Sequence, residues 1–390
     1  MVNIRVVELA QHLAGPYCSW VLASLGAEVI KVEPPGTGEG ARGTPPLAAG
    51  RSLFFDSLNR GKRSLTLDLK RPEAQAILHR LLKDTDVLIE NYRPGVRDRL
   101  GCSDETLRQV NPRLIRASIS GFGQRGDLAG RPAFDIIVQA MSGTMSINGP
   151  EGGPFCRVGF SIGDIAAALF TAIGILARLH ERDAAGGGVA PVEISMLACQ
   201  VALLENAYAR YLNAGIHPQP IGTRHPSITP FEAFPTADEP IVIAIRGQKD
   251  WPVFCETVGL HEIAADPRFA GEAARLEHHA EFRALVEARL QVRGRDAWLR
   301  ALTGADIPCA PINTVPEFAG SALIREIGGL SEVATGDGKT FRYANSPLRD
   351  AAFSPAERPA PLLGLHTSEI LADLGYSQVE AEAFANDGIV

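Results

Sequence analysis

The stretch IRVVELAQHLAGPYCSWVLASLGAEVIKVE, residues 4–33, decides the fold class of this chain. It opens with an apolar run at 4–10, continues through a helical pattern at 17–25 and returns to an apolar run at 27–33. Two buried strands that are joined by one helix form a βαβ unit, in which the strands lie parallel in the same sheet. The stretch therefore predicts a parallel sheet with crossover helices.

The same alternation continues through the first half of the chain. Apolar runs at 64–70, 85–92 and 112–119 indicate further buried strands, each followed by a turn or a helix. After the proline-rich stretch 217–240 come one apolar run and several amphipathic patterns, which indicate a second, smaller α+β domain. We expect a large α/β domain over 1–200, a linker at 201–240, a small domain at 241–312, and a segment at 313–390 that returns to the large domain.

Composition and charge argue against several classes of protein. The chain has 390 residues, of which 45% are hydrophobic, so it can bury a sizeable core. Its net charge of -7 argues against binding to nucleic acid or to an acidic membrane, because both attract positive fields. The six cysteines lie far apart without metal-ligand spacing, which indicates reduced thiols and no metal site. We expect a cytoplasmic protein, since the longest apolar run, 165–177, is shorter than the roughly 20 residues of a membrane span.

Three short motifs point to other functions. PPGTGEG (34–40) has glycines after a strand, but prolines precede them and no helix opens on them, unlike a dinucleotide fingerprint. NRGKRS (59–64) lacks the first glycine of a phosphate loop. GFSIG (159–163) fits the nucleophile elbow of serine hydrolases, with His366 as a base, although the stretch before it is a poor core strand. A serine hydrolase is therefore an alternative.

The start of the apolar helix after GFSIG carries one carboxylate, Asp164. Aspartate is a preferred helix N-cap and its charge suits the positive end of a helix, so the residue pattern by itself favours a cap. The same position would lower the pKa of the carboxylate and would place the N–H group of Gly163 where it could hold an oxyanion, which suits a nucleophile. The two roles are compatible.

Basic side chains gather after the predicted strands of the first domain. An open parallel sheet binds ligands beyond the carboxyl ends of its strands, so this set predicts an anionic ligand that bears phosphate. Its members are Arg42, Lys62, Arg63, Lys70, Arg93, Arg97, Arg99 and Arg131.

A long ordered series of segments resembles the family III CoA-transferases, the CaiB/BaiF-like proteins, which include formyl-CoA transferase and have α-methylacyl-CoA racemase as a relative. The resemblance implies a homodimer of two interlocked, ring-like subunits, each with a Rossmann-like large domain and a small domain, and it implies that Asp164 is the nucleophile. The segments are residues 6–36, NRGKRSLTLDLK (59–70), VLIENYRPG (87–95), ISGFGQRG (119–126), RPAFDIIVQAMSG (131–143), VGFSIGD (158–164), GTRHPSITPFEAFPTAD (222–238) and LGLHTSEILADLGY (363–376).

The resemblance also implies which residues contact coenzyme A, which enters as a substrate and not as a tightly bound cofactor. Asp135 stands where formyl-CoA transferase has a glutamate beside the thioester. Pro34 replaces a CoA-contacting arginine, so Arg42 or another residue must supply that charge, and Arg131 belongs to the same basic set. The positions that match CoA contacts are Leu13, Ala14, Lys70, Asn91, Tyr92, Arg93 and Arg99.

Departures from the family pattern bear on the substrate. The glycine-rich loop of formyl-CoA transferase is reduced to IRGQKDW (245–251), in which Gly247 and Gln248 keep the resemblance, so oxalate is not expected. Phe134 replaces the catalytic histidine of the racemases and cannot exchange a proton, which favours transfer over the racemase alternative. We expect Arg157 and Arg246 to clamp the second carboxylate of a diacid, which predicts exchange between succinyl-CoA and a C4 to C6 diacid, with Gly163 and Gly247 holding the oxyanion.

Overall fold

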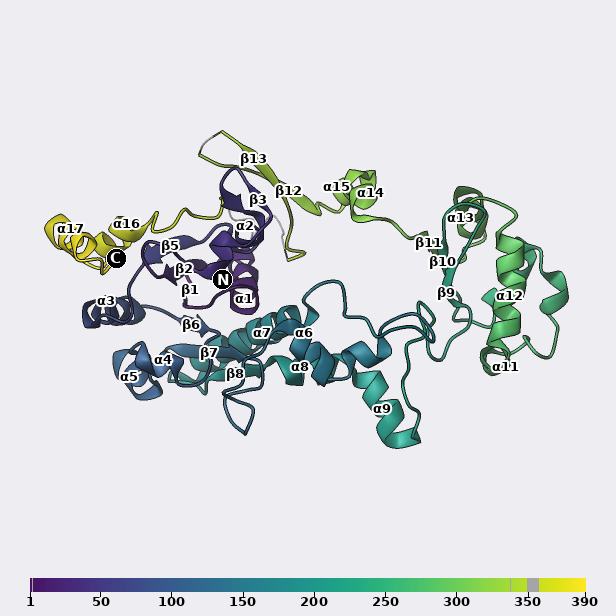
Figure 1. Cartoon of the computed structure of the whole chain (residues 1–390), viewed down its shortest axis with the longest axis horizontal. Coiled ribbons are helices and arrows are strands. Elements are labelled where there is room, and N and C mark those ends of the chain that lie inside the picture. The colour runs from purple at the N-terminus through teal and green to yellow at the C-terminus, as the bar shows by residue number, and fades with distance from the viewer. Residues whose placement is uncertain (2, 337, 349–357) are drawn as a thin grey trace. The chain divides into compact units, whose positions relative to one another are not determined.

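The computed structural model describes residues 1, 3–336, 338–348 and 358–390, which form two compact units (Figure 1). The large unit comprises the segments Met1–Thr144, Arg157–Ile216 and Arg325–Val390. The small unit comprises Met145–Cys156 and His217–Ile324, so it is inserted between segments of the large unit. The prediction had a large domain over 1–200 and a returning segment at 313–390, whereas residues 145–156 belong to the small unit and the C-terminal part belongs to the large unit only from Arg325 onward.

A six-stranded parallel sheet forms the centre of the large unit, as the alternating pattern predicted. The strand order is β5-β2-β1-β6-β7-β8, with Val6 of β1 level with Val29 of β2 on one side and with Val87 of β6 on the other. In doubly wound sheets of this order, the chain leaves the central pair of strands in opposite directions and a crevice opens at their carboxyl ends. The strands are β1 (Arg5–Glu8), β2 (Glu28–Glu33), β5 (Arg63–Thr66), β6 (Val87–Glu90), β7 (Ile115–Ser120) and β8 (Val192–Ser195).

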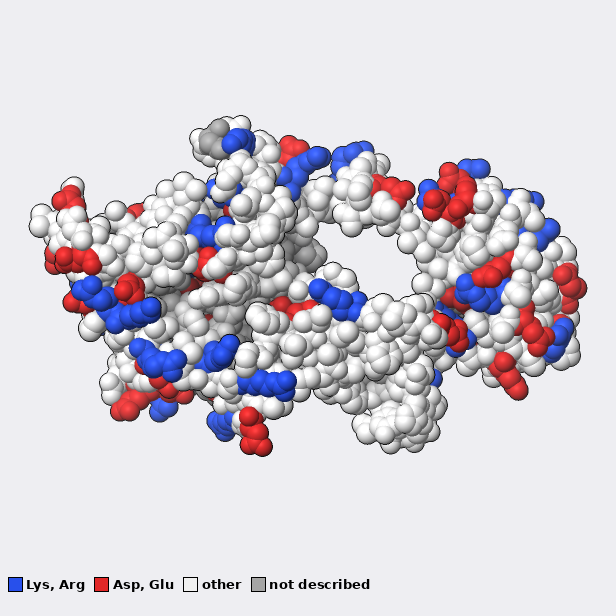
Figure 2. Space-filling model, in the orientation of Figure 1, with Lys and Arg blue, Asp and Glu red and all other residues white. Residues whose placement is uncertain are grey.

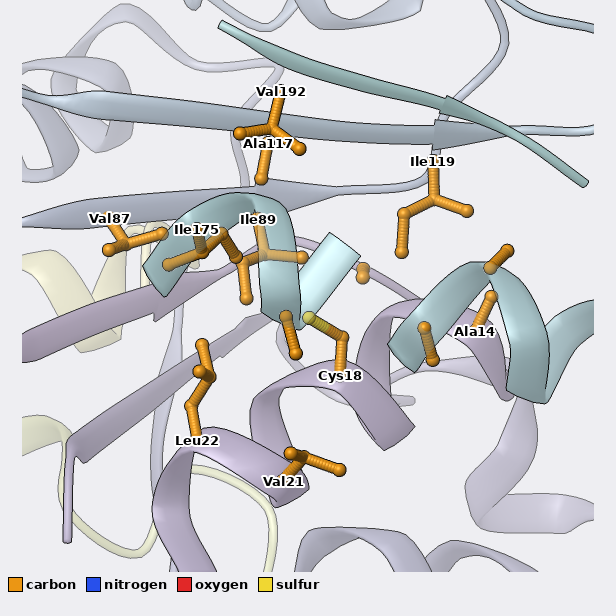
Figure 3. Packing of buried hydrophobic residues seen from close by; sticks show 14 of the residues in the cluster. Ala14, Cys18, Val21, Leu22, Val87, Ile89, Ala117, Ile119, Ile175 and Val192 are labelled. Carbon is orange, nitrogen blue, oxygen red and sulfur yellow. The ribbon is translucent and has the colours of Figure 1, made fainter. Parts of the chain in front are cut away.

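Helices α1 (Ala14–Ser24) and α7 (Ile162–Ala185) pack together against one face of the sheet. Cys18 and Leu22 of α1 and Ile175 of α7 meet Ile89 of β6 in the largest apolar cluster (Figure 3). A methyl group on Gly15 would lie 2.1 Å from Cβ of Ala10, so only glycine allows α1 to begin this close to the end of β1. Helices α6 (Asp135–Met141), α8 (Met196–Leu203) and α9 (Glu205–Ala214) continue this side of the unit.

The opposite face of the sheet is covered by helices from both ends of the chain. Ile77 and Leu78 of α3 (Pro72–Leu82) share a buried cluster with Ile370 and Leu371 of α16 (Thr367–Asp373). Burial of each such side chain contributes roughly 1.5–3 kcal/mol, so the C-terminal segment stabilises the large unit directly. The remaining elements of this unit are η1 (Gly40–Gly43), β3 (Leu47–Ala48), β4 (Arg51–Ser52), α2 (Leu53–Asn59), α4 (Val96–Arg99), α5 (Asp104–Val110), β12 (Leu330–Ala334), β13 (Thr340–Ala344) and α17 (Gln378–Asn386).

The small unit has its own three-stranded antiparallel sheet and its own core. The strand order is β11-β10-β9, and the fully buried Trp251 and Trp298 are the largest side chains of its apolar cluster. Residues 201–240 were predicted as a linker, and this is wrong because α9 lies within the large unit and Phe234 of β9 pairs with Ile241 of β10 in the small unit. The elements are β9 (Phe231–Phe234), β10 (Ile241–Ala244), α10 (Asp250–Val258), η3 (His261–Ile263), α11 (Glu272–Glu277), α12 (His279–Leu290), α13 (Arg295–Gly304), β11 (Cys309–Pro311) and α14 (Val315–Gly320), while η2 (Thr144–Ile147) and α15 (Ala322–Glu326) lie at its borders.

Helix α7 is longer than the apolar run in the sequence indicated. By length and composition it is the one helix in the described part of the chain that could cross a membrane. Its inward face, which includes Ala167, Thr171 and Ile175, is fully buried in the large unit. A core helix of this kind passes the same test, so the finding is weak evidence for a membrane span.

Candidate active site

Asp164 lies in the first turn of α7, at the third residue of the helix. The residue before the helix is Ser161, and the predicted cap at Asp164 is therefore wrong. The helix begins earlier than its apolar run because residues 162 and 163 already adopt helical geometry. The carboxylate is consequently free of a capping role.

Asp164 also differs from expectation in its acidity. Burial and then the negative charge of Asp135 raise the pKa of Asp164 to about 7, whereas the helix end was expected to lower it. A helix terminus contributes up to about 2 kcal/mol in partly buried geometries, and desolvation of a carboxylate is larger. Near neutral pH the site therefore holds comparable amounts of the acid and of the carboxylate.

Asp135, the second carboxylate of the site, begins α6 and is buried. Its Oδ1 accepts the N–H of Gly163 at 2.7 Å, and its Oδ2 accepts the side-chain amide of Gln139 at 2.6 Å. The N–H of Gly163, expected to hold an oxyanion, is thus already used by Asp135. The preceding Phe134 is 71% exposed and adds no group that exchanges protons.

Two glutamines complete this cluster and were missed in the sequence. Gln139 Oε1 accepts the N–H of Val158 at 2.9 Å, so the amide bridges α6 and the segment that leads into α7. Gln200 of α8 is 1% exposed and its Oε1 accepts the hydroxyl of Thr144 at 2.6 Å. A lone glutamine within the apolar run of residues 196–204 was the signal that could have pointed to Gln200.

Arg157 is the predicted substrate residue that the structure brings to this cluster. Its NH2 group lies 3.8 Å from Oδ2 of Asp135, and its Nε donates to the carbonyl of Val158 at 3.0 Å. The side chain is 45% exposed, so the guanidinium keeps donors on its solvent side. Arg246, Gly247 and Gln248 belong to the small unit, where Gln248 donates to the carbonyl of Ala270.

Several of the predicted CoA contacts lie in the loops that follow the carboxyl ends of β1 and β6. The side-chain amide of Asn91, after β6, accepts the N–H of Gln11 at 2.9 Å and donates to the carbonyl of Gln11 at 2.7 Å. These bonds join the two loops on which Asn91, Tyr92, Leu13 and the start of α1 lie. The joined loops form the part of the sheet edge where folds of this order bind nucleotides.

A fully buried charge cluster supports the loop between β1 and α1. Although burial opposes its ionisation, the charges of Lys31 and Lys62 lower the pKa of Glu8 to about 2. Burial lowers the pKa of Lys62 to about 8, although the charge of Glu8 opposes this shift. The ammonium group of Lys31 donates to the carbonyl of Ala10 at 3.0 Å, and that of Lys62 to the carbonyl of Pro16 at 3.0 Å.

The same loop is strained at one residue. His12 adopts a φ of 63°, a left-handed conformation that is uncommon for a residue with a side chain. Its N–H donates to Oε2 of Glu39 at 2.6 Å, and Oε1 of Glu39 lies 2.9 Å from the ammonium of Lys31. Backbone strain that surrounding charges hold in place is typical of ligand sites.

The predicted basic set separates into exposed and internally paired members. Arg42 is paired, because its Nε and NH2 groups donate to the carboxylate of Glu33 at 2.6 Å and its guanidinium stacks 4.0 Å from the ring of Phe55. Arg42, which was expected to supply the charge missing at Pro34 unless another residue does so, thus shares its guanidinium with Glu33. Exposed members of the set are Lys70, Arg93, Arg99 and Arg131.

The hydrolase alternative fails on geometry. The residues before Ser161 form no strand, so the strand-turn-helix of a nucleophile elbow is missing from this described segment. Nδ1 of His366 accepts the N–H of Ser64 at 3.1 Å, on the edge strand β5. Ser161 precedes α7, which packs against β7 and β8 near the opposite edge of the sheet.

Comparison with known proteins gives concordant matches. The model of CoA-transferase family III matches residues 1–367. Acetyl-CoA:oxalate CoA-transferase of Acetobacter aceti is 40% identical over 318 residues, covering 81% of this chain and 82% of that protein. Succinate–glutarate CoA-transferase of Agrobacterium fabrum is 36% identical over 382 residues, which are 95% of each chain. The crystal structure of a CaiB/BaiF family protein from Brucella suis is 32% identical, with a TM-score of 0.85 over 96% of this chain and 98% of that one.

Proposed function

The chain belongs to CoA-transferase family III, and we propose that it transfers CoA from an acyl-CoA to a dicarboxylic acid through covalent intermediates on Asp164. The observation that carries this proposal is the position of Asp164, a carboxylate at the start of an apolar helix beside a second carboxylate, Asp135. Desolvation makes the ionised carboxylate a better nucleophile, whereas burial and the charge of Asp135 raise its pKa to about 7, so that it is ionised above neutral pH.

The proposed reaction needs no oxidant, reductant or external base. Asp164 attacks the thioester carbonyl, the carbon–sulfur bond breaks, and a mixed anhydride and CoA thiolate form. The thiolate attacks the aspartyl carbonyl and releases the donor acid, which leaves an aspartyl-CoA thioester. The acceptor carboxylate attacks this thioester to give a second anhydride and the thiolate, and attack of the thiolate on the acceptor carbonyl then releases the new acyl-CoA and Asp164. Splitting the exchange in this way lowers each barrier.

We propose that the nucleotide part of CoA binds at the loops that follow β1 and β6. The bonds between Gln11 and Asn91 support this placement, because they preorganise the two loops before the ligand arrives. Exposed Arg93 and Arg99 follow the same strand and provide charge for phosphate groups. Binding energy far from the thioester would then orient it toward Asp164.

A dicarboxylate is the acceptor class that the chain favours. Relatives at 34 to 36% identity over at least 95% of this chain are named succinate–glutarate, succinyl-CoA:glutarate and succinyl-CoA–D-citramalate CoA-transferases. The half-exposed guanidinium of Arg157 beside Asp135 has donors left for a second carboxylate. The proposed substrates are therefore succinyl-CoA and a C4 to C6 diacid.

The helices around Asp164 leave a broad apolar face exposed. On the side shown in Figure 2, the part of the large unit formed by α8 and α9 carries few charged side chains. Exposed patches of this kind mark interfaces, which supports a homodimer that covers them. The exposed apolar residues of α6 to α9 include Ile136, Met141, Leu169, Phe170, Ile173, Leu176, Val201, Leu203 and Leu212.

A charged side chain introduced on the exposed apolar face of α6 to α9 tests the dimer proposal. Ile173→Glu should convert the dimer into monomers in light scattering, because Ile173 is 61% exposed on α7. Val379→Glu is the matched control, since Val379 is 76% exposed on α17 and outside the apolar face. A dimer that persists in Ile173→Glu, or a wild-type monomer, would contradict the proposal.

The transfer reaction is tested with Asp164→Asn. We expect this variant to lose exchange between succinyl-CoA and isotopically labelled succinate by at least about a thousandfold, while calorimetry shows unchanged CoA binding. Whole-protein mass after incubation with succinyl-CoA should show a CoA adduct on the wild type, which hydroxylamine converts to an aspartyl hydroxamate. The control variant Ser161→Ala should retain both the exchange reaction and the CoA adduct. Transfer at the wild-type rate by Asp164→Asn would refute the mechanism.

A further inference from the structure

A hydrogen bond to its carbonyl oxygen holds the side-chain amide of Gln200 in one orientation. Its Oε1 accepts from Thr144 at 2.6 Å, and the Thr144 hydroxyl lies 2.9 Å from that of Ser142. The carbonyl of Ser142 accepts the hydroxyl of Tyr208 at 3.0 Å, which fixes this chain of contacts from α9. The amide nitrogen of Gln200 therefore points away from Thr144.

The amide nitrogen of Gln200 is a buried donor without an acceptor among the described residues. It lies 2.9 Å from the point that a Cβ of Gly163 would occupy, and Oδ1 of Asp135 lies 3.0 Å from the same point. The donor is thus beside the backbone that carries Asp164 and beside the carboxylate that acts on Asp164 electrostatically. Buried donors are almost always paired in native proteins, so an unpaired one at a reacting group calls for a functional reason.

The ionisable groups around Asp164 leave few other sources of positive potential. Asp135, from α6, is negative and raises the pKa of Asp164, whereas Arg157 is half-exposed and 3.8 Å from Asp135. Burial raises the pKa of Cys199 on α8 to about 11, so its thiol is neutral. Three other elements that pack against α7 also carry ionisable side chains. On α1, burial raises the pKa values of Tyr17 and Cys18. On β7, Arg116 pairs with Asp104, and on β8, Glu193 is exposed.

We propose that Gln200 is a positioning residue of the Asp164 site, whose free N–H stabilises the negative charge that Asp164 and Asp135 share when both are ionised. This inference rests on the proposed role of Asp164 as nucleophile. Because Thr144 holds the carbonyl end of the amide, the donor end is available without a change of rotamer. A fixed dipole that is aimed at a site of developing charge needs no reorganisation during the reaction.

The proposal predicts opposite pH effects for two substitutions. Gln200→Met keeps the length and removes the donor, so the acid limb of kcat/KM for succinyl-CoA should move up by about one pH unit, a roughly tenfold loss at pH 6 with near-normal activity at pH 9. Gln200→Glu keeps a donor while it is protonated and adds a negative charge when it ionises, so activity should instead fall at high pH. Cys199→Ala, on the same helix, is the packing control and should not change the midpoint of the acid limb of kcat/KM.

A direct titration separates this proposal from the proposed function. Carbon-13 NMR of aspartate side chains, with Asp164→Asn to assign the signal, reports the midpoint for Asp164 without any turnover. A higher midpoint in Gln200→Met than in wild type supports the role of Gln200 even if succinyl-CoA is not a substrate. Equal midpoints in the two folded proteins, or a pH profile in Gln200→Met that is lower at every pH by one factor, would overturn it.

Discussion

The acidity of Asp164 predicts how the Asp135→Asn substitution changes the pH profile. Asp135 raises the pKa of Asp164 to about 7 together with burial, which is the larger cause. The difference from the ordinary aspartate pKa of 3.8 corresponds to roughly 4 kcal/mol that disfavours the carboxylate form. Removing the charge of Asp135 should therefore lower the midpoint below 7, and burial should keep it above 3.8.

The structure also indicates what Asp135→Asn disturbs. Asparagine keeps an oxygen for the N–H of Gly163 but presents an amide group to the amide nitrogen of Gln139, which loses its acceptor. An unpaired buried donor costs about 1–3 kcal/mol, so the plateau activity and the stability should both fall. The relative activity at pH 5.5, compared with the plateau of the same protein, should nevertheless rise.

The assay is kcat/KM for the acyl-CoA donor between pH 5 and 9, because this parameter reports ionisation in the free enzyme. In the wild type we expect an acid limb with a midpoint near 7, and about a tenfold increase from pH 6 to pH 8. Asp135→Asn should move this limb to lower pH. A wild-type midpoint near 4, or a limb that moves to higher pH in the variant, would refute the electrostatic reasoning.

Three further predictions concern stability. Because the folded-state pKa of Asp164 is raised, the folded protein loses stability as the pH rises from 3.8 to about 7. Asp164→Asn should therefore stabilise the protein at pH 8 by up to roughly 4 kcal/mol and should have little effect at pH 4. Thermal melts at the two pH values measure this difference. Lys62→Met removes one of the ionic partners of the buried Glu8 carboxylate and should lower the free energy of unfolding, measured in urea, by about 3–5 kcal/mol. The same substitution at the exposed Lys70 should lower it by less than about 0.5 kcal/mol. A methyl group at Gly163 would lie 2.9 Å from the amide of Gln200, so Gly163→Ala should cost about 1–3 kcal/mol, whereas Gly43→Ala, with open space around it, should be neutral; equal effects would contradict the packing argument.

The fold of the large unit was predictable because its strands are continuous apolar runs. The runs around Val6, Val29 and Val87 are buried on both faces, and such strands have a pattern that needs no knowledge of their partners. The start of the small unit was not predictable in this way. β9 lies within the proline-rich stretch, and only its pairing with β10 shows that it is a strand.

The resemblance pointed to Asp164, whereas the hydrogen bonds and the acidity around this residue could not be predicted from the sequence. The bond between Gly163 and Asp135 spans 28 residues, and it uses the donor that local reasoning assigned to an oxyanion. The acidity of Asp164 depends on burial by elements distant in the sequence, which a helix-end argument omits. Gln139 and Gln200 could not be identified from the sequence, because a glutamine in a helix can be exposed or buried and its hydrogen-bond partners are far away in the sequence.

The way the chain closes on itself has a consequence for its biosynthesis. Thr367 bonds to Thr66 of β5 across 301 residues, and the carbonyl of Ile389 accepts the N–H of Asp68 at 2.8 Å. A nascent large unit leaving the ribosome therefore keeps one face of β5 uncovered until the final helices have been translated. The small unit has its strands and core within residues 217–324, so its core needs no segment translated later, although the ribosome makes it after all six strands of the large sheet.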